Sequence, residues 1–305
     1  MTGADLALAA GFIRRSQNPD GGWGYQPGRQ SLVEPSALCA LALHAGDAPE
    51  AARRGLAFLE SCQKPSGAVG VGPADTVGGW MAYAALLAFH ALGAADRERR
   101  LRAWILAWED ASRRFSKTDI AEIAARFRYD ASIQGWGWTP RTTAWIEPTA
   151  LFILALRRTG TAATEPRIKS GLALISDRRV PSGGWNFGNP YSRSFELEAT
   201  ALSTALALAA LGAAGVREED AAAAAGLGYL AACLAGEVST AALAWSVLAL
   251  KSFPGRAALA RDAAARLARL QAPDGGFRGN LFETALAGLV LSGLPILLPA
   301  AEGAR

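Results

Sequence analysis

Acidic residues recur where the most apolar segments of this sequence begin. They are Glu34, Asp75, Glu147, Glu196, Glu198, Glu237 and Glu283. Like charges gathered in a poorly solvated place raise some of their pKa values, which would let a carboxyl group act as a proton donor. The remaining carboxylates would stabilise a cation. The competing explanation is structural, because the helix macrodipole stabilises an acidic residue in the first turn by about 0.3–1 kcal/mol.

Large aromatic residues occur in or beside the same apolar segments. The candidates for contact with a substrate are Trp80, Tyr83, Trp145, Phe152, Trp245 and Phe282. Aromatic faces attract cations, which suits a reaction that passes through a carbocation. Core packing explains each of these residues taken singly, and an apolar pocket lined by aromatic rings also describes an ordinary lipid-binding site.

Two kinds of helical segment alternate along the chain, and each kind occurs six times. The amphipathic, arginine-rich kind covers Leu6–Gln17, Glu50–Gln63, Asp96–Asp110, Glu165–Arg178, Glu218–Leu234 and Ala257–Gln271. The kind that is apolar nearly all round covers Val33–Ala45, Val77–Leu92, Ile146–Arg157, Leu197–Leu211, Val238–Leu250 and Glu283–Leu294. Amphipathic helices lie on a surface and uniformly apolar helices lie in an interior. The alternation predicts an all-α chain with six inner and six outer helices that closes into an (α/α)6 toroid.

The links between these segments repeat as well. Gln17-Asn-Pro-Asp-Gly-Gly-Trp23 nearly equals Gln271-Ala-Pro-Asp-Gly-Gly-Phe277, and Val180-Pro-Ser-Gly-Gly-Trp185 is a third copy. Proline followed by aspartate or serine and then glycine is typical of tight turns. We expect the glutamine to cap a helix end and the aromatic residue to pack between helices. Residues 1–305 are predicted to form one domain, in which about 112–133 is an insertion with a short helix near Ile120–Phe127.

The composition sets limits on the class of protein. Hydrophobic residues make up 51% of the chain and charged residues 19%, so a large core can form. No basic region precedes an apolar run at the N-terminus, and no apolar stretch reaches the roughly 20 residues of a spanning helix. The cysteines, Cys39, Cys62 and Cys233, are odd in number and lie inside helical patterns. We therefore expect reduced thiols and a cytoplasmic protein.

The formal net charge is +4, and clustered arginines carry it. One cluster is Arg97, Arg99, Arg100 and Arg102. A solvated outer helix face explains this pattern, and peripheral contact with anionic lipid is the alternative. No nucleic-acid module accompanies the charge, so a nucleic-acid partner is not expected.

The link sequence resembles the QW repeat of squalene-hopene cyclases. Glu34-Pro-Ser-Ala-Leu and Glu147-Pro-Thr-Ala-Leu are similar to inner-helix starts of the wider terpenoid cyclase and protein prenyltransferase superfamily. The resemblance covers essentially the whole chain and implies a single-domain, bacterial-type member. It also implies a polyprenyl or other apolar small-molecule substrate, cyclised by acid-initiated carbocation chemistry in an aromatic-lined central cavity.

Two motifs of that superfamily are incomplete here. Its cyclases protonate an alkene with the central aspartate of Asp-x-Asp-Asp, whereas Gly72-Pro-Ala-Asp75-Thr keeps only the last aspartate and has Ala74 at the donor position. Its protein prenyltransferases bind zinc through Asp, Cys and His, whereas Glu283-Thr-Ala-Leu-Ala-Gly has neither cysteine nor histidine. His44 and His90 end two different inner segments. We expect no metal and no cofactor.

Three functions compete. The leading hypothesis is an isoprenoid cyclase-like enzyme with Asp75, Glu196 or Glu198 as the acid and with Glu34 and Glu147 as further candidates. The second is a non-catalytic toroid that binds a lipid or a protein. The third is a glycan-active α/α barrel with two catalytic carboxylates. Its sugar platforms would be Trp23, Trp136, Trp138 and Trp185.

Overall fold

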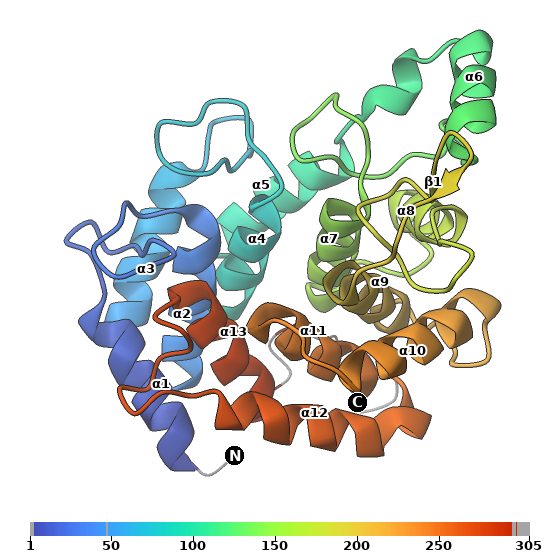
Figure 1. Cartoon of the computed structure of the whole chain (residues 1–305). Coiled ribbons are helices and arrows are strands. Elements are labelled where there is room, and N and C mark those ends of the chain that lie inside the picture. The colour runs from blue at the N-terminus through green and yellow to red at the C-terminus, as the bar shows by residue number, and fades with distance from the viewer. Residues whose placement is uncertain (1–2, 47, 295–296, 298–305) are drawn as a thin grey trace. The chain divides into compact units, whose positions relative to one another are not determined.

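The computed structural model describes residues 3–46, 48–294 and 297 and consists mainly of helices (Figure 1). Within that part of the chain the strands are β1 (Tyr191–Ser192) and β2 (Phe195–Glu196), which form an antiparallel hairpin. The predicted all-α class is confirmed. No helix among these residues is both long and apolar enough to cross a bilayer. The chain divides into two compact units, one built from the chain up to residue 107 and from 264 onward, the other from 108–263.

In the first unit, three apolar helices pack side by side. Helix α2 (Val33–Ala45) contacts both α13 (Leu281–Ser292) and α4 (Ala82–Ala91). Figure 1 shows α2 in blue beside α13 in red, although they come from opposite ends of the sequence. The outer helices of this unit are α1 (Gly3–Arg15), α3 (Pro49–Cys62) and α5 (Ala95–Leu106). Helix α2 is apolar all round because it has neighbours on both sides and an outer helix behind it.

The second unit repeats this arrangement. Helix α9 (Ala201–Ala213) packs against both α7 (Ile146–Arg158) and α11 (Thr240–Lys251). The outer helices are α8 (Pro166–Asp177) and α10 (Ala221–Leu234). Helix α12 (Ala257–Arg269) follows the short 3₁₀ helix η2 (Pro254–Arg256) and has residues in both units.

The predicted helices are all present, and two of the inner ones begin four or five residues later than expected. Helix α4 begins at Ala82 rather than Val77, because the preceding residues form turns that include Gly78 at φ +86°. Helix α9 begins at Ala201 rather than Leu197, because the β1–β2 hairpin takes up the preceding residues and Thr200 caps the helix. The Thr200 hydroxyl accepts the Ser203 N–H at 3.1 Å. Periodicity alone does not register a cap or a hairpin.

The insertion contains the 3₁₀ helix η1 (Ala111–Arg114) and α6 (Lys117–Phe127), as expected. Ser116 and Asp119 form a capping box at the start of α6, and Arg128 ends it in the left-handed conformation. No residue of α6 is buried. Helix α6 contacts β1, and Figure 1 shows the two side by side. The insertion therefore adds little to the core of its unit.

The glutamine of two recurrent links joins a turn to an outer helix, whereas the sequence predicted that it would cap a helix end. The Gln17 side chain donates from Nε2 to the carbonyls of Gly21 (2.8 Å) and Ala51 (3.0 Å), which ties the turn to the next outer helix. Gln63 makes the same pair of bonds to Gly67 (3.2 Å) and Arg97 (3.0 Å). The amide thus connects the turn to the first turn of the next outer helix.

The link tryptophans are part of the core. Trp23, Trp136 and Trp185 are fully buried. Each packs against a glycine of the following outer helix, and the glycines are Gly55, Gly171 and Gly226. The backbone N–H of each tryptophan donates to a hydroxyl near the start of an inner helix, namely Ser36 (2.7 Å), Thr149 (3.0 Å) and Thr204 (2.9 Å). The tryptophan therefore joins outer helix, link and inner helix.

Candidate functional site

Backbone hydrogen bonds hold the starts of three inner helices. The Val33 N–H of α2 donates to the Val71 carbonyl at 3.0 Å, and the Ile146 N–H of α7 donates to the Phe187 carbonyl at 2.9 Å. At the start of α13, the Leu281 N–H donates to Tyr25 at 2.8 Å. In each case the acceptor belongs to a link of a neighbouring repeat. These three helices carry an acidic residue in the first turn, so the loops also fix where those carboxylates lie.

The expectation that every inner helix opens with an acidic residue is correct for half of them. Glu34, Glu147 and Glu283 lie in the first turns of α2, α7 and α13. The first turns of α4, α9 and α11 contain no acidic residue. The residues expected there belong to the segments that precede these helices, and they are Asp75, Glu196, Glu198 and Glu237.

Asp75 organises its own loop. Its carboxylate accepts the backbone N–H groups of Val71 (3.0 Å), Val77 (2.9 Å) and Gly78 (3.4 Å). Burial opposes ionisation, but these hydrogen bonds and the nearby Lys64 together hold the pKa of Asp75 below its usual value. Through Val71, Asp75 supports the contact that fixes the start of α2. It is therefore ionised at neutral pH and has a structural role.

Glu196 and Glu198 are exposed. Glu196 lies on β2, and its side chain accepts the Ser182 N–H at 2.9 Å, which holds the pKa of this carboxyl below its usual value. Glu198 follows the hairpin, two residues before the Thr200 cap of α9. Neither carboxylate has the buried surroundings expected of a proton donor.

Glu34 is buried, and two tyrosines bind it. Tyr25 donates its phenolic O–H to Oε2 at 2.5 Å, and Tyr83 donates to Oε1 at 2.7 Å. Burial and the adjacent Glu34 carboxylate raise the pKa values of both phenols. A carboxylate is an acceptor-only group when ionised, and here each of its oxygens accepts one phenol.

Two candidate aromatic residues surround this carboxylate–phenol cluster. The Trp80 ring stacks on Tyr83 with centroids 6.2 Å apart, and the Phe282 ring lies 6.0 Å from that of Tyr25. Trp80 and Phe282 are both partly exposed. Glu34, Tyr25, Tyr83, Trp80 and Phe282 thus combine a buried carboxylate with accessible aromatic surface, a combination that attracts cations.

Glu147 has a different environment. It lies in the first turn of α7 and is only partly exposed, and its Oε1 accepts the Ser203 hydroxyl at 3.1 Å. Burial raises the pKa of Glu147, and the Ser203 hydrogen bond offsets part of this effect. The neighbouring Trp145 is partly exposed and directly precedes the helix. Glu147 is thus a carboxyl group that keeps its proton to higher pH than an ordinary glutamate does.

The remaining aromatic candidates lie in the core of the second unit. Phe152 is fully buried, with its ring 5.4 Å from Trp108 and 5.8 Å from Trp136. Trp245 is buried within α11. Both positions favour a packing role over contact with a ligand.

Tyr25 and Ser203, which bind the two glutamates, are not marked by any pattern in the sequence. Tyr25 lies in the link between α1 and α2, two residues after Trp23. Ser203 lies 56 residues beyond Glu147. The exact recurrence of Glu-Pro at the starts of α2 and α7 was a usable signal for the acids, but no comparable pattern marks their donors.

Comparison with known proteins shows what the fold is similar to. Type II terpene cyclase MstE from Scytonema matches with a TM-score of 0.63 and 18% identity, over 96% of this chain and 98% of that one. A protein from Actinoplanes matches with a TM-score of 0.63 and 16% identity, over 95% of this chain and 98% of that one. An alpha-amylase from Clostridium perfringens matches with a TM-score of 0.62 and 12% identity, again over 95% of this chain and 98% of that one. No family model and no curated protein matches the sequence.

These similarities show the fold, a terpenoid cyclase-like α/α toroid, as predicted. They extend over nearly the full length of each chain. The alpha-amylase also shares the fold, so the fold by itself does not select an activity. The sugar-platform role expected for Trp23, Trp136 and Trp185 is wrong, because all three are fully buried.

Proposed function

We propose that this protein is an isoprenoid cyclase in which Glu147 is the proton donor. The observation that carries the proposal is the position of Glu147 in the first turn of α7, where it is only partly exposed and accepts the Ser203 hydroxyl. Burial there disfavours the charged form and raises the pKa of Glu147. A general acid has to hold its proton at the working pH, and burial is a common means of achieving this.

The other candidate acids are less suited to this step. The pKa values of Asp75 and Glu196 are lowered by hydrogen bonds from backbone N–H groups and other nearby groups. Glu198 is exposed. Glu34 is bound by two phenols, which fit a carboxylate better than a proton donor.

The proposed reaction balances without a metal or a cofactor. The carboxyl O–H of Glu147 breaks, and its proton forms a C–H bond with the electron pair of an alkene in a polyprenyl chain. A second alkene attacks the resulting carbocation and forms the ring bond. Water accepts a proton from the carbon next to the final cation, which leaves an alkene, and solvent returns a proton to the Glu147 carboxylate. The product is therefore an isomer of the substrate. Trp145, next to Glu147 in sequence, has exposed aromatic surface to stabilise the first cation.

Structures of the cyclase neighbour supply the test substrate. Variants of MstE have been solved with geranylgeranyl dihydroxybenzoate as substrate and with merosterolic acid A as product. The first substrate series should therefore contain polyprenyl chains that carry an aromatic headgroup, polyprenyl chains that carry a diphosphate instead, and polyprenyl chains with neither group. The cytoplasmic location and the peripheral contact with lipid remain predictions.

The decisive experiment incubates wild-type protein and Glu147→Gln with this substrate series and analyses the products by mass spectrometry. The wild type should form an isomer of the substrate, and Glu147→Gln should lose at least 100-fold in turnover because the amide cannot supply the proton. Its fold should persist, since the glutamine carbonyl can still accept the Ser203 hydroxyl. Glu237→Gln is the control, because Glu237 is exposed in the segment before α11.

Other outcomes identify the competing functions. Retention of unchanged polyprenyl lipid by the wild type, with no product, would replace the cyclase with a lipid-binding toroid. Cleavage of an α-glucan would favour the glycan-active class, to which the alpha-amylase neighbour points. Equal turnover by the wild type and Glu147→Gln would remove Glu147 as the acid.

A further inference from the structure

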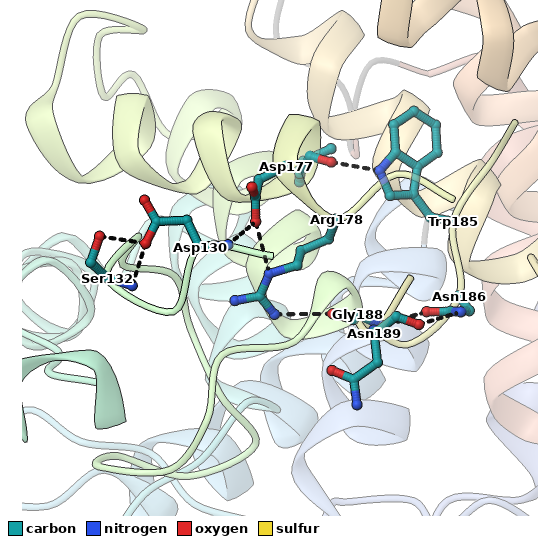
Figure 2. A network of polar contacts seen from close by, with 9 residues as sticks. Asp130, Ser132, Asp177, Arg178, Trp185, Asn186, Gly188 and Asn189 are labelled. Carbon is teal, nitrogen blue, oxygen red and sulfur yellow. Dashed lines mark hydrogen bonds and ion pairs between the residues drawn. The ribbon is translucent and has the colours of Figure 1, made fainter. Parts of the chain in front are cut away.

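Arg178 is a buried arginine at the C-terminal end of α8 (Figure 2). Its Nε lies 3.2 Å from Oδ2 of Asp177, and its Nη1 donates to the Gly188 carbonyl at 3.0 Å. The guanidinium also lies over the Tyr129 ring, 3.4 Å from the centroid. An arginine buried among three such contacts has one defined position and can transmit that position to the groups it binds.

The loop that Arg178 binds is tightly built. The Asn186 side chain accepts the N–H groups of Gly188 (2.9 Å) and Asn189 (3.1 Å) and donates to the Asn189 carbonyl at 2.9 Å. Gly188 has φ +139°, a conformation that side chains rarely adopt. A Cβ at Gly188 would lie 3.5 Å from the Ile146 nitrogen, so the loop runs directly against the start of α7.

This loop holds the helix that carries Glu147. The Phe187 carbonyl accepts the Ile146 N–H at 2.9 Å, and Glu147 is the next residue. The connection from Arg178 to Glu147 therefore runs through two successive loop carbonyls, that of Gly188 and that of Phe187.

The insertion supports Arg178 from its other side. The Asp130 N–H donates to Oδ2 of Asp177 at 3.1 Å, and Asp130 Oδ1 in turn accepts the Ser132 N–H at 2.8 Å and its hydroxyl at 2.6 Å (Figure 2). Together with Tyr129, these contacts connect the non-repeating segment to the arginine. They provide a role for a segment that the repeat pattern does not explain.

We propose that Arg178 is a positioning residue for Glu147, acting through the 186–189 loop. The inference rests on the catalytic role proposed for Glu147. The first unit offers a contrast, because the matching loop is held there by Asp75, which binds Val71 from within the loop. In the second unit the charged group that holds the loop is Arg178, at the end of the outer helix α8. A substitution at Arg178, outside the loop, can therefore move the start of α7.

The test compares Arg178→Met and Arg178→Lys with Arg157→Met. Arg157 is the matched control because it is also buried and donates to the carbonyls of Ala213 (2.9 Å) and Thr161 (2.7 Å), but at the opposite end of α7. Amide hydrogen exchange at Ile146 reports the loop contact directly and needs no substrate. Turnover, measured as kcat and KM separately, reports its effect on Glu147.

We expect Arg178→Met to speed exchange at Ile146 at least 10-fold and to lower kcat about 10- to 100-fold with KM little changed, as expected of a displaced catalytic group. Arg178→Lys should change the exchange rate at Ile146 and kcat in the same directions but by less. Arg157→Met should leave exchange at Ile146 unchanged. If Arg178→Met does not fold, Arg178→Lys carries the test, since lysine keeps the charge beside Asp177 but cannot also reach Gly188 in the same way.

Two negative results have different meanings. Unchanged exchange at Ile146 in the Arg178 variants, or an equal increase in Arg157→Met, would overturn the positioning role even in an active enzyme. Faster exchange in the Arg178 variants with unchanged kcat would also overturn it. A wild-type protein without any turnover would contradict the proposed function, and the exchange measurement would still decide whether Arg178 holds the start of α7.

Discussion

Two glutamates in equivalent positions differ in the donors they meet. Glu34 and Glu147 both open an inner helix and both precede a proline. Glu34 accepts two phenolic O–H groups, whereas Glu147 accepts one serine hydroxyl, and burial raises the pKa of Glu147. Hydrogen bonds to the charged form and loss of solvent act in opposite directions on a carboxyl group. Equivalent positions in the repeat therefore give the two carboxyl groups different surroundings.

The pH dependence of Glu147 provides a test at this scale. Activity should fall as the pH rises through the pKa of Glu147, because only the protonated form donates. The Ser203 hydrogen bond lowers this pKa, so Ser203→Ala should raise it and move the alkaline limb of the kcat profile to higher pH. Ser246→Ala is the control, since the Ser246 hydroxyl bonds within α11 to the Ala242 carbonyl. An alkaline limb that moves to lower pH would contradict the assignment.

Only some of these residues could be predicted from the sequence. Glu34 and Glu147 are marked by the Glu-Pro pair that begins each helix. Asp75 resembles them in sequence, but its carboxylate binds three N–H groups of its own loop. Turn geometry of that kind is not encoded in hydrophobic periodicity. Ser203 could not be paired with Glu147 because their contact depends on how α7 and α9 pack.

At the scale of elements, the glycines of the outer helices matter as much as the link tryptophans. Gly226 of α10 lies directly on the indole ring of Trp185. Trp185 is fixed further by its indole N–H, which donates to the Ile175 carbonyl at 2.6 Å, so the ring cannot easily move away. Gly228 lies on the same helix and has no atom near the place of a Cβ.

These two glycines make a matched pair of substitutions. Gly226→Ala should destabilise the fold by about 1–3 kcal/mol because it overpacks the site of the tryptophan. Gly228→Ala should stabilise it by about 0.5–1 kcal/mol because alanine favours a helix more than glycine does. Denaturant unfolding measures both. Equal effects of the two changes would mean that the close approach of α10 and Trp185 is absent.

The helices themselves follow closely from the sequence. The predicted inner segment Val33–Ala45 coincides with α2, and the short helix expected near Ile120–Phe127 is α6. The late starts of α4 and α9 could not be predicted in the same way. They depend on Gly78 in the left-handed region and on the Thr200 cap, which override an apolar pattern that continues through both boundaries.

At the scale of the whole molecule, stability is distributed unevenly. The inner helices are buried over most of their length, whereas α6 has no buried residue. Segments with few buried contacts open at low free energy, and proteases cut where a segment opens. The insertion is therefore the weakest part of its unit, apart from the contacts that Tyr129 and Asp130 make with Arg178 and Asp177.

Limited digestion with trypsin should make its first cut in the insertion. The exposed basic residues there are Arg113, Arg114, Lys117, Arg126 and Arg128. Mass spectrometry of early fragments should place the cut at one of them, while Arg53 and Arg54 of α3 remain intact for longer because α3 packs against α2. A first cut within α3 would contradict this ranking.

The fold was predictable because it repeats, whereas the activity was not. Six alternations of amphipathic and apolar segments indicate the class of fold even where single boundaries are wrong. The proposed acid is a single residue, Glu147, whose pKa depends on local burial and on the Ser203 hydroxyl. A cyclase and an amylase both have a fold similar to this one, so the arrangement of helices does not by itself decide the reaction.

The pairing of α2 with α13 has a consequence for the order in which the chain folds during synthesis. The second unit is one continuous stretch, 108–263, and can be completed as soon as that stretch has left the ribosome. The first unit cannot be completed as early, because α2 packs against α13, which is synthesised about 250 residues later. Until then one apolar side of α2 is uncovered, and a chaperone that binds nascent apolar helices would find its target in α2.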